Sequence, residues 1–350
     1  MPKITFFTNI FPSTNEPYKG TFIKNSYLEF KSNGWHTNLI SLKKEKSKLI
    51  SYAKFYIKSA KELINLDGIA YIHYVSHSSV PAILIKIIKT DIKLVLHYHG
   101  SDAFPEASEG PLKRRIKRVI CRAANKASTH IIAPTEEFKF RLISEYEIPE
   151  NKISSNPSGG VNEEIFNESK RPFIKKPCIT YASRMIKGKG AITAAQSITS
   201  LSHENPDIFF IGDGPEKESA LNILNKSNIA YKTSGMISQC DLSQIFKRTD
   251  IFLFPSTRPG ESLGLTWLEA VFCGAIPLII RNGITEHLIP AKYHSDLVAD
   301  DENDFCHKLS KLYLKRDEFP KIQSDLITTY RDKFSNKKSF IELSKLLKSL

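Results

Sequence analysis

Short apolar runs alternate with longer segments of helical period along this chain, and the alternation is interrupted once before it starts again. The apolar runs are 4–11, 37–42, 69–75, 94–99 and 129–134 in the first half, and 178–182, 207–211, 230–233, 250–255, 275–280 and 297–299 in the second. Strand, helix and strand at this spacing favour βαβ units, in which helices cover both faces of a parallel sheet. The sequence therefore predicts an α/β fold of two doubly wound, Rossmann-like domains that face a ligand-binding cleft.

A polar stretch with two prolines, 167–177, interrupts the alternation. Its composition is typical of a linker. We therefore place an N-terminal domain at 1–170 and a C-terminal domain at 171–335.

The positive charge of the chain is concentrated in its first half. Of the net +13, residues 1–160 contribute +10, from 24 Lys and Arg against 14 Asp and Glu, and residues 161–350 contribute +3. Such an excess is typical of proteins that bind nucleic acids or anionic membranes. No nucleic-acid motif and no aromatic residues interleaved with the basic ones accompany it, so we expect no nucleic-acid partner.

The most basic segment, 112–126, has the period of an amphipathic helix. Its apolar positions form a single stripe that we expect to pack on the core: Leu112, Ile116, Val119, Ile120 and Ala123. Its other positions carry seven cations and no acid: Lys113, Arg114, Arg115, Lys117, Arg118, Arg122 and Lys126. Two interpretations stay open, a solvated face above a core stripe and a surface that attracts acidic lipid.

The cysteines and the apolar segments indicate a reduced, cytoplasmic protein. Five cysteines are scattered without a C-x-x-C pair, which is typical of free thiols. The N-terminal residues do not resemble a signal peptide. The longest uncharged apolar stretch, 270–280, has about half of the ~20 residues that a spanning helix needs.

Glycines, cations and acids follow several strands predicted in the second half. Arg184 and Lys189 come after the run 178–182, a glycine-rich turn at 212–216 follows the next run, and a polar loop at 255–264 follows the run 250–255. Ligands of parallel sheets bind beyond the carboxyl ends of the strands. We therefore expect an anion site there.

The segment 260–269 carries the most chemistry. A helix that starts near Ser262 would direct its free N–H groups toward an anion such as a diphosphate. Glu261 would lie at the mouth of this helix, and Glu269, seven residues in, would share the face and accept hydrogen bonds from a ribose diol. Arg184 and Lys189 would neutralise charge as a metal does elsewhere. No D-x-D element ends a strand, so we expect no metal and no cofactor.

The run 255–270, with Glu261 and Glu269, resembles the E-x7-E signature of retaining family 4 glycosyltransferases of the GT-B fold. Ser183-Arg184 with Lys189-Gly190 resembles the family's G-R-L-x-x-x-K-G element, Gly212 to Glu216 its G-D-G-P-E turn, and His99 to Asp102 its H-G-x-D element. Two departures are Lys19-Gly20-Thr21, where paired glycines are usual, and Ser183 in place of glycine.

The resemblance implies a role for each matching residue. The donor diphosphate would be bound by Arg184, by Lys189 and by the helix start formed by Ser262, Leu263, Gly264 and Leu265. Glu269 would bind the donor ribose. Glu261 would bind the transferred sugar, His99 would lie near the reacting centre, and Met236 and Ile237 would line the base pocket. Gly20, Gly212 and Gly214 are candidates for donor loops, although the last two can equally serve turn geometry. Asp102 is a candidate for substrate contact or for a helix cap. His97 is expected to be structural and to lie on the other face from His99.

The implied activity is retaining, metal-independent transfer from a nucleotide diphosphate sugar to an acceptor hydroxyl. The implied acceptors are a bacterial surface polysaccharide such as lipopolysaccharide, or a lipid-linked oligosaccharide, at the inner face of the cytoplasmic membrane. The resemblance further implies that a terminal helix at about 336–350 crosses back onto the first domain. Two alternatives are a nucleotide-sugar epimerase of similar architecture and a non-catalytic protein that binds nucleotide sugars or anionic lipids.

Overall fold

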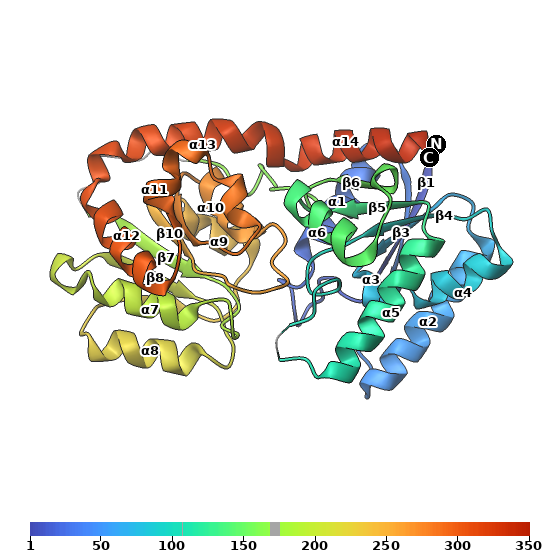
Figure 1. Ribbon diagram of the computed structural model, residues 1–350, viewed down its shortest axis with the longest axis horizontal. Helices are drawn as coiled ribbons and strands as arrows, with labels where there is room; N and C mark the ends of the chain where they lie inside the picture. Colours follow the sequence, from blue (N-terminus) through green and yellow to red (C-terminus); the bar gives the residue numbers. More distant parts are fainter. Residues whose placement is uncertain (107, 169–175) are drawn as a thin grey trace. The chain divides into compact units, whose positions relative to one another are not determined.

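The computed structural model describes residues 1–106, 108–168 and 176–350, and two six-stranded parallel sheets organise it (Figure 1). The first unit consists of Met1–Gly160 and Asn336–Leu350, and the second of Val161–Ser335. Each unit has its own sheet with helices between consecutive strands. The predicted α/β class with two doubly wound, Rossmann-like domains is therefore confirmed.

The first sheet has the strand order β2-β1-β3-β4-β5-β6. Its strands are β1 (Lys3–Thr8), β2 (His36–Ser41), β3 (Ile69–His73), β4 (Lys93–His97), β5 (His130–Ala133) and β6 (Ile153–Ser155). The residues of β3 and β5 are buried along their whole length, as expected for strands covered on both faces. Strand β6 was not predicted, because its sequence Ile-Ser-Ser has no apolar run.

Helices cover both faces of this first sheet. They are α1 (Thr21–Ser32), α2 (Lys48–Asn65), α3 (Val75–Ser78), α4 (Val80–Ile88), α5 (Pro111–Ala127), α6 (Glu136–Tyr146) and α14 (Asn336–Ser349). Phe6 packs with α1, whereas the preceding Thr5 donates a hydrogen bond of 3.2 Å to Glu62 of α2. Consecutive strand residues point to opposite faces, so α1 and α2 lie on opposite sides of the sheet. Figure 1 shows α2, α4 and α5 side by side.

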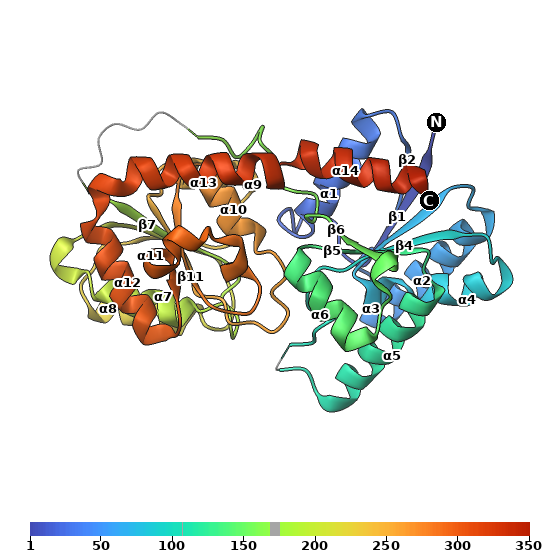
Figure 2. The same ribbon diagram turned by 45° about the horizontal axis from the view of Figure 1, so that its top comes forward.

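The C-terminal helix α14 belongs to the first unit and packs on α1 (Figure 2). Leu343 and Leu347 join the core of this unit, and the Phe30 and Phe340 rings meet edge to face with their centroids 4.9 Å apart. The Ser339 hydroxyl donates to the Asn156 side chain at 2.8 Å. These contacts place the last residues of the chain on the fold formed by its first residues.

The second sheet has the strand order β12-β11-β10-β7-β8-β9. Its strands are β7 (Cys178–Ala182), β8 (Asp207–Ile211), β9 (Lys232–Ser234), β10 (Ile251–Phe254), β11 (Ile276–Ile280) and β12 (Val298–Ala299). Its helices are α7 (Ala191–Thr199), α8 (Lys217–Lys226), α9 (Gln239–Phe246), α10 (Leu265–Phe272), α11 (His294–Leu297), α12 (Glu302–Leu314) and α13 (Phe319–Phe334). Every strand matches a run predicted from the sequence to within a few residues.

The boundary between the units falls between Gly160 and Val161, earlier than the predicted boundary at residue 170. Val161 and Phe166 are fully buried in the core of the second unit, and this burial assigns the segment before the predicted linker to that unit. Most of the linker predicted at 167–177, namely 169–175, lies outside the described residues.

The predicted orientation of the basic helix is wrong. Helix α5 has the expected bounds, but Leu112, Ile116 and Val119 of the predicted core stripe are exposed. The residues of α5 that are buried are Lys117, Cys121, Ala124 and Asn125. Within the described part of the chain, none of the helices has the length and apolar character that crossing a bilayer requires.

Candidate functional site

The loops that follow β7, β8 and β10 meet at the carboxyl edge of the second sheet. The Met185 amide donates to the Asp213 carbonyl at 2.8 Å, which joins the loop after β7 to the loop after β8. A Cβ on Gly212 would lie 1.8 Å from the Ser183 carbonyl oxygen, and a Cβ on Gly214 would lie 2.4 Å from that of Met185. Both glycines therefore serve the close approach of two backbones.

Lys189 and Glu261 form a buried ion pair at this edge. The Lys189 Nζ lies 2.6 Å from the Glu261 Oε2, and their side chains are 11% and 8% exposed. The Ser256 hydroxyl donates to the same carboxylate oxygen at 2.6 Å. Gly190, at φ +71°, lets the two segments approach, since a Cβ there would lie 2.2 Å from the Pro255 carbonyl oxygen. The structure thus brings together two residues that are 72 positions apart in the sequence.

Arg258 is a second buried cation beside this pair, and it was not among the predicted site residues. Burial raises the pKa of Glu261, but the charges of Lys189 and Arg258 and the hydrogen bonds outweigh burial and hold the pKa at about 2. Glu261 is therefore an anion at neutral pH. Arg258 lies within the run 255–270 that carried the resemblance, so its position in that run was the available signal.

Arg184 differs from the other two cations because it is exposed. It follows β7 by two residues, at the same edge of the sheet as Lys189. Burial lowers the pKa of Lys189, and Glu261 counteracts that effect. Solvent or a ligand can therefore reach Arg184 directly, whereas the protein encloses Lys189 and Arg258.

Helix α10 begins at Leu265 and not near Ser262, so the predicted start is wrong. Gly264 precedes the helix in a left-handed conformation, at φ +72°, and a Cβ there would lie 2.7 Å from the rings of Phe254 and Trp267. Ser262 and Leu263 are buried in the loop before the helix. Consequently Glu261 lies in a loop, and Glu269 is on the second turn of the helix.

Glu269 has no cation as a partner among its described contacts, in contrast to Glu261. The Gln239 Nε2 donates to its Oε1 at 3.3 Å. Burial raises the pKa of Glu269 to about 7, and the Gln239 hydrogen bond acts in the opposite direction. Gln239 is the first residue of α9 and follows Met236 and Ile237, which are half-buried. Gln239 was not predicted, because no sequence pattern relates it to a glutamate on another helix.

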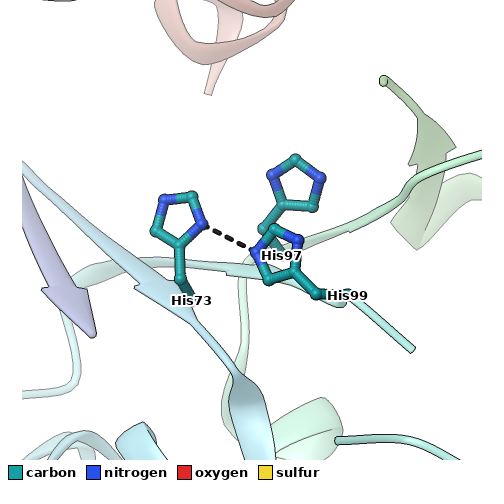
Figure 3. A group of neighbouring side chains, drawn as sticks. All are labelled: His73, His97 and His99. Carbon is teal, nitrogen blue, oxygen red and sulfur yellow. Dashed lines mark hydrogen bonds between the residues drawn. The ribbon is translucent and has the colours of Figure 1, made fainter. Parts of the chain in front are cut away.

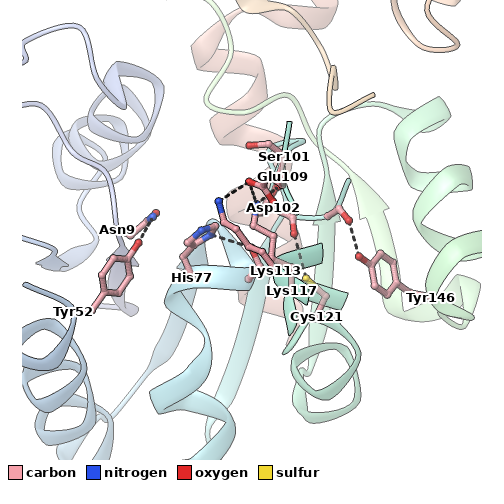
Figure 4. Close-up of polar contacts among 12 residues, drawn as sticks. Asn9, Tyr52, His77, Ser101, Asp102, Glu109, Lys113, Lys117, Cys121 and Tyr146 are labelled. Atoms are coloured by element: carbon pink, nitrogen blue, oxygen red, sulfur yellow. Dashed lines mark hydrogen bonds and ion pairs between the residues drawn. The ribbon is translucent and has the colours of Figure 1, made fainter. Parts of the chain in front are cut away.

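In the first unit, Asp102 connects the ends of two neighbouring strands. Its carboxylate accepts hydrogen bonds from the backbone amides of Val75 and His99, each at 3.0 Å. Val75 is the first residue of α3, so Asp102 caps that helix and not the segment after itself. Burial raises the pKa of Asp102 to about 6, and the two amides act in the opposite direction. Figure 4 shows Asp102 beside Cys121 of α5.

His99, which is half-buried, belongs to a group of three histidines with the buried His73 and His97 (Figure 3). The His73 Nδ1 and His99 Nε2 share a hydrogen bond of 2.9 Å, and the His99 Nδ1 and Ser158 hydroxyl share one of 3.1 Å. The rings of His97 and His99 stack with their centroids 4.6 Å apart. The prediction that His97 lies on the other face is therefore wrong, since residues two apart on a strand share a face.

Burial lowers the pKa of all three histidines, that of His97 to about 3, so all three are neutral at pH 7. Their nearest nitrogen atoms lie within 4.8 Å of one another, which makes them the group to consider as metal ligands in the described part of the chain. However, the hydrogen bond between His73 and His99 and the stacked rings are features of a neutral polar network. The expected absence of a metal stays a prediction.

Gly20, the remaining candidate in the first unit, precedes α1 in a left-handed conformation, at φ +73°. A Cβ on Gly20 would lie 3.2 Å from the Ile10 carbonyl oxygen. The glycine thus fits a tight turn between the loop after β1 and the start of α1.

Comparisons with known proteins match both units. Residues 25–159 match the family model described as Glycosyltransferase Family 4, and residues 162–327 match the model described as Glycosyl transferases group 1. N-acetyl-alpha-D-glucosaminyl L-malate synthase of Bacillus anthracis is 24% identical over 245 residues, which cover 64% of this chain and 61% of that protein.

Solved structures resemble the whole chain. Sucrose-phosphate synthase of Thermosynechococcus elongatus has a TM-score of 0.79 at 13% identity, over 100% of this chain and 99% of that one. HepE of Anabaena, solved with UDP and glucose, has a TM-score of 0.78 at 14% identity, over 100% of both chains. These likenesses support the GT-B fold. Because the two family models together match most of the sequence, this chain belongs to the family 4 glycosyltransferases of the GT-B fold.

Proposed function

We propose that this glycosyltransferase moves a sugar from a nucleotide diphosphate sugar to an acceptor hydroxyl, with retention of the anomeric configuration and without a metal. The observation that carries the proposal is the cationic edge of the second sheet. Arg184 is exposed there, and Lys189 and Arg258 are enclosed around Glu261.

The enclosed residues give this edge a fixed electrostatic arrangement. The Glu261 carboxylate, to which the Ser256 hydroxyl donates, holds the Lys189 ammonium group in one place. The exposed Arg184 can bind phosphate oxygens in a bidentate manner. The free amides at the start of α10 add donors and a favourable dipole. Preorganised donors of this kind stabilise charge that develops on a leaving diphosphate, and no protein reorganisation is needed at that moment.

Glu269 is the proposed ligand of the donor ribose. The half-buried Glu269 carboxylate can accept two hydrogen bonds from a vicinal diol, and the Gln239 amide orients it. Met236 and Ile237, in the segment just before Gln239, are the proposed contacts of the base.

His99 and Glu261 are the proposed contacts of the transferred sugar. His99 is neutral, so it can exchange hydrogen bonds with sugar hydroxyls without adding a charge. Asp102 and Ser158 fix the backbone and the ring of His99. In the proposed retaining reaction the leaving phosphate helps to deprotonate the acceptor, so the reaction requires no nucleophile from the protein.

The similar proteins support a uridine nucleotide as the first donor to test, since HepE of Anabaena was solved with UDP-glucose. The acceptor that we propose is a bacterial surface polysaccharide such as lipopolysaccharide, or a lipid-linked oligosaccharide. The positive charge of residues 1–160 supports an acceptor that carries phosphate or lies at an anionic membrane, on its cytoplasmic side.

The experiment that tests this proposal is a donor screen followed by product analysis. A donor should raise the unfolding temperature, because a ligand that binds only the folded state stabilises it. With that donor and an acceptor mixture, NMR should show the product with the anomeric configuration of the donor, and EDTA should leave the rate unchanged. An inverted product or loss of activity in EDTA would contradict the proposed mechanism. Conversion of the donor without any acceptor would instead favour an epimerase.

A further inference from the structure

Helix α5 presents apolar side chains to the outside of the first unit. Leu112, Ile116 and Val119 are 72%, 50% and 59% exposed, and they lie on adjoining turns. The side of α5 that faces the sheet carries Cys121, Ala124 and Asn125, whose small size allows the helix to lie close to the strands. The apolar stripe that gives this helix its amphipathic period is therefore available to a partner.

Lys117 is the exception among the cations of this helix, because it points inward (Figure 4). Its side chain is 7% exposed, and its Nζ lies 2.7 Å from the Glu109 Oε1 and 3.1 Å from the Ser101 carbonyl oxygen. Lys117 thus ties α5 to the loop before it. The prediction that Lys117 contacts a membrane is therefore not supported by its position.

The neighbouring helices continue the exposed apolar surface. Helix α4 packs against both α2 and α5, and the three lie side by side (Figure 1). The large apolar side chains that they expose are Leu49, Ile50, Ile57 and Ile64 of α2, Leu84, Ile87 and Ile88 of α4, and Leu112, Ile116 and Val119 of α5. We call these ten residues the α2–α4–α5 face. So many large apolar residues exposed on adjoining helices indicate an interaction surface.

The three helices carry many more cations than acids. Helix α5 has no Asp or Glu, and its side chains Arg115, Arg122 and Lys126 are exposed. Helices α2 and α4 add five lysines and a single acid, Glu62. A helix that combines apolar side chains with a surplus of Lys and Arg is typical of segments that lie in the interface of an anionic bilayer.

An apolar cleft of about 480 Å³ opens at the N-terminal end of α5. Leu112, Ile116 and Ile120 line it on one side, and Ser76 and His77 of α3 line it on the other. Burial lowers the pKa of His77 to about 4, so His77 adds no charge to the cleft at neutral pH. Lys113 and Lys117 also line the cleft. The cleft therefore offers apolar side chains for a hydrocarbon chain next to cations that suit a phosphate headgroup.

We propose that the α2–α4–α5 face docks the protein on an anionic phospholipid bilayer. Leu112, Ile116 and Val119 insert among the acyl chains, the cleft accepts part of one chain, and Arg115, Arg122 and Lys126 bind lipid phosphates. This proposal rests on the proposed function only for the reason why the protein would bind a membrane, namely that its acceptor is carried by a lipid. The complementary charge of the helices favours a bilayer over a second copy of this chain, which would bring like charges together.

Flotation of the full chain with vesicles tests the proposal. The protein should float with vesicles of phosphatidylcholine mixed with phosphatidylglycerol and remain unbound with phosphatidylcholine alone. Each cation near such a surface contributes ~1 kcal/mol, so Arg115→Gln/Arg122→Gln/Lys126→Gln should weaken partitioning on the order of a hundredfold. A matched control in the second unit, Lys311→Gln/Arg316→Gln/Lys321→Gln, removes the same charge and should retain binding.

A second variant, Leu112→Ser/Ile116→Ser/Val119→Ser, tests insertion, with Leu314→Ser as the exposed apolar control in the second unit. The triple variant should lose flotation, whereas the control should retain it. Unfolding curves should show that both are folded, since exposed substitutions change stability little. Flotation that does not depend on acidic lipid, or that both triple variants retain, would overturn the proposal. The proposal would also be overturned if the protein did not bind vesicles and the apolar substitutions converted it from a dimer to a monomer. Donor binding by the unbound protein would leave the proposed transferase function intact.

Discussion

Glu261 and Glu269 lie eight positions apart, yet their surroundings give the two carboxylates opposite properties. Glu261, in the loop before α10, contacts Lys189 and lies near Arg258, and its pKa is held at about 2. Glu269, on α10, receives one hydrogen bond from Gln239, and burial raises its pKa to about 7. One is a permanent anion that holds cations in place, and the other changes charge near neutral pH.

The spacing of the two glutamates alone therefore does not assign their roles. Glu261 is part of a buried charge cluster, so its removal alters structure as well as function. Glu269 is half-buried, and a ligand or a proton is favourable there because desolvation of a carboxylate without a cation is costly.

The largest effect is expected for Lys189→Met. It leaves the buried Glu261 anion with Arg258 alone, and removal of one partner of a buried pair costs about 3–5 kcal/mol. Chemical denaturation should show this loss of unfolding free energy. The exposed neighbour variant Lys187→Met should unfold like the wild type. Lys189→Met/Glu261→Gln should recover most of the loss, and a double variant no more stable than the single one would show that the pair is not the cause.

Arg184→Ala should separate function from stability. Arg184 is exposed, so its removal should change the unfolding free energy by less than about 0.5 kcal/mol. Loss of one charged donor to a developing anion lowers turnover by about 10²–10³. Turnover with a saturating donor provides the measurement, and Lys187→Ala the control for charge. Full turnover by Arg184→Ala would remove Arg184 from the diphosphate site.

Glu269→Gln should change how stability depends on pH. The folded pKa of about 7 lies above the ordinary value of 4.5, so the folded state binds the proton more tightly than the unfolded state. Stability is therefore expected to fall as pH rises from about 4.5 to about 7, by roughly 2–3 kcal/mol in total. Glu269→Gln should abolish this decrease in denaturation curves recorded across that range. The same decrease in wild type and variant would show that another group titrates.

Gln239→Ala should give the smallest effect. Its hydrogen bond lowers the pKa of Glu269, so the variant should shift the pH dependence of donor affinity to higher pH, at a cost of about 1 kcal/mol. In the wild type, affinity should increase with pH through about 7, because ionised Glu269 accepts ribose hydrogen bonds best. Calorimetric titrations at several pH values measure the shift. Gln244→Ala, on the same helix, should leave the profile in place.

The sequence predicted those parts of the molecule in which one residue pattern determines one element. Fully buried strands such as β3 and β7 are continuous apolar runs, and they were found with nearly correct bounds. Strand β6 was missed because a three-residue edge strand depends on its neighbour β5 and not on its own composition.

The orientation of α5 shows why packing could not be predicted in the same way. The helix turns its small residues Cys121 and Ala124 inward, and Lys117 is buried because Glu109, in a preceding loop, neutralises it. Arg258 and Gln239 were missed for a related reason, since their relevance depends on partners from other elements. A pattern within one segment carries no information on such partners.

Hydrogen exchange with and without a nucleotide diphosphate sugar tests the central claim, that the edge of the second sheet binds the donor. The donor chosen is the one that stabilises the protein most in the screen. The account predicts slower exchange in 183–190 and 256–269, lost in Arg184→Ala, with α7 and α12 as unaffected references. Donor binding that protects other segments and leaves these two unchanged would contradict it.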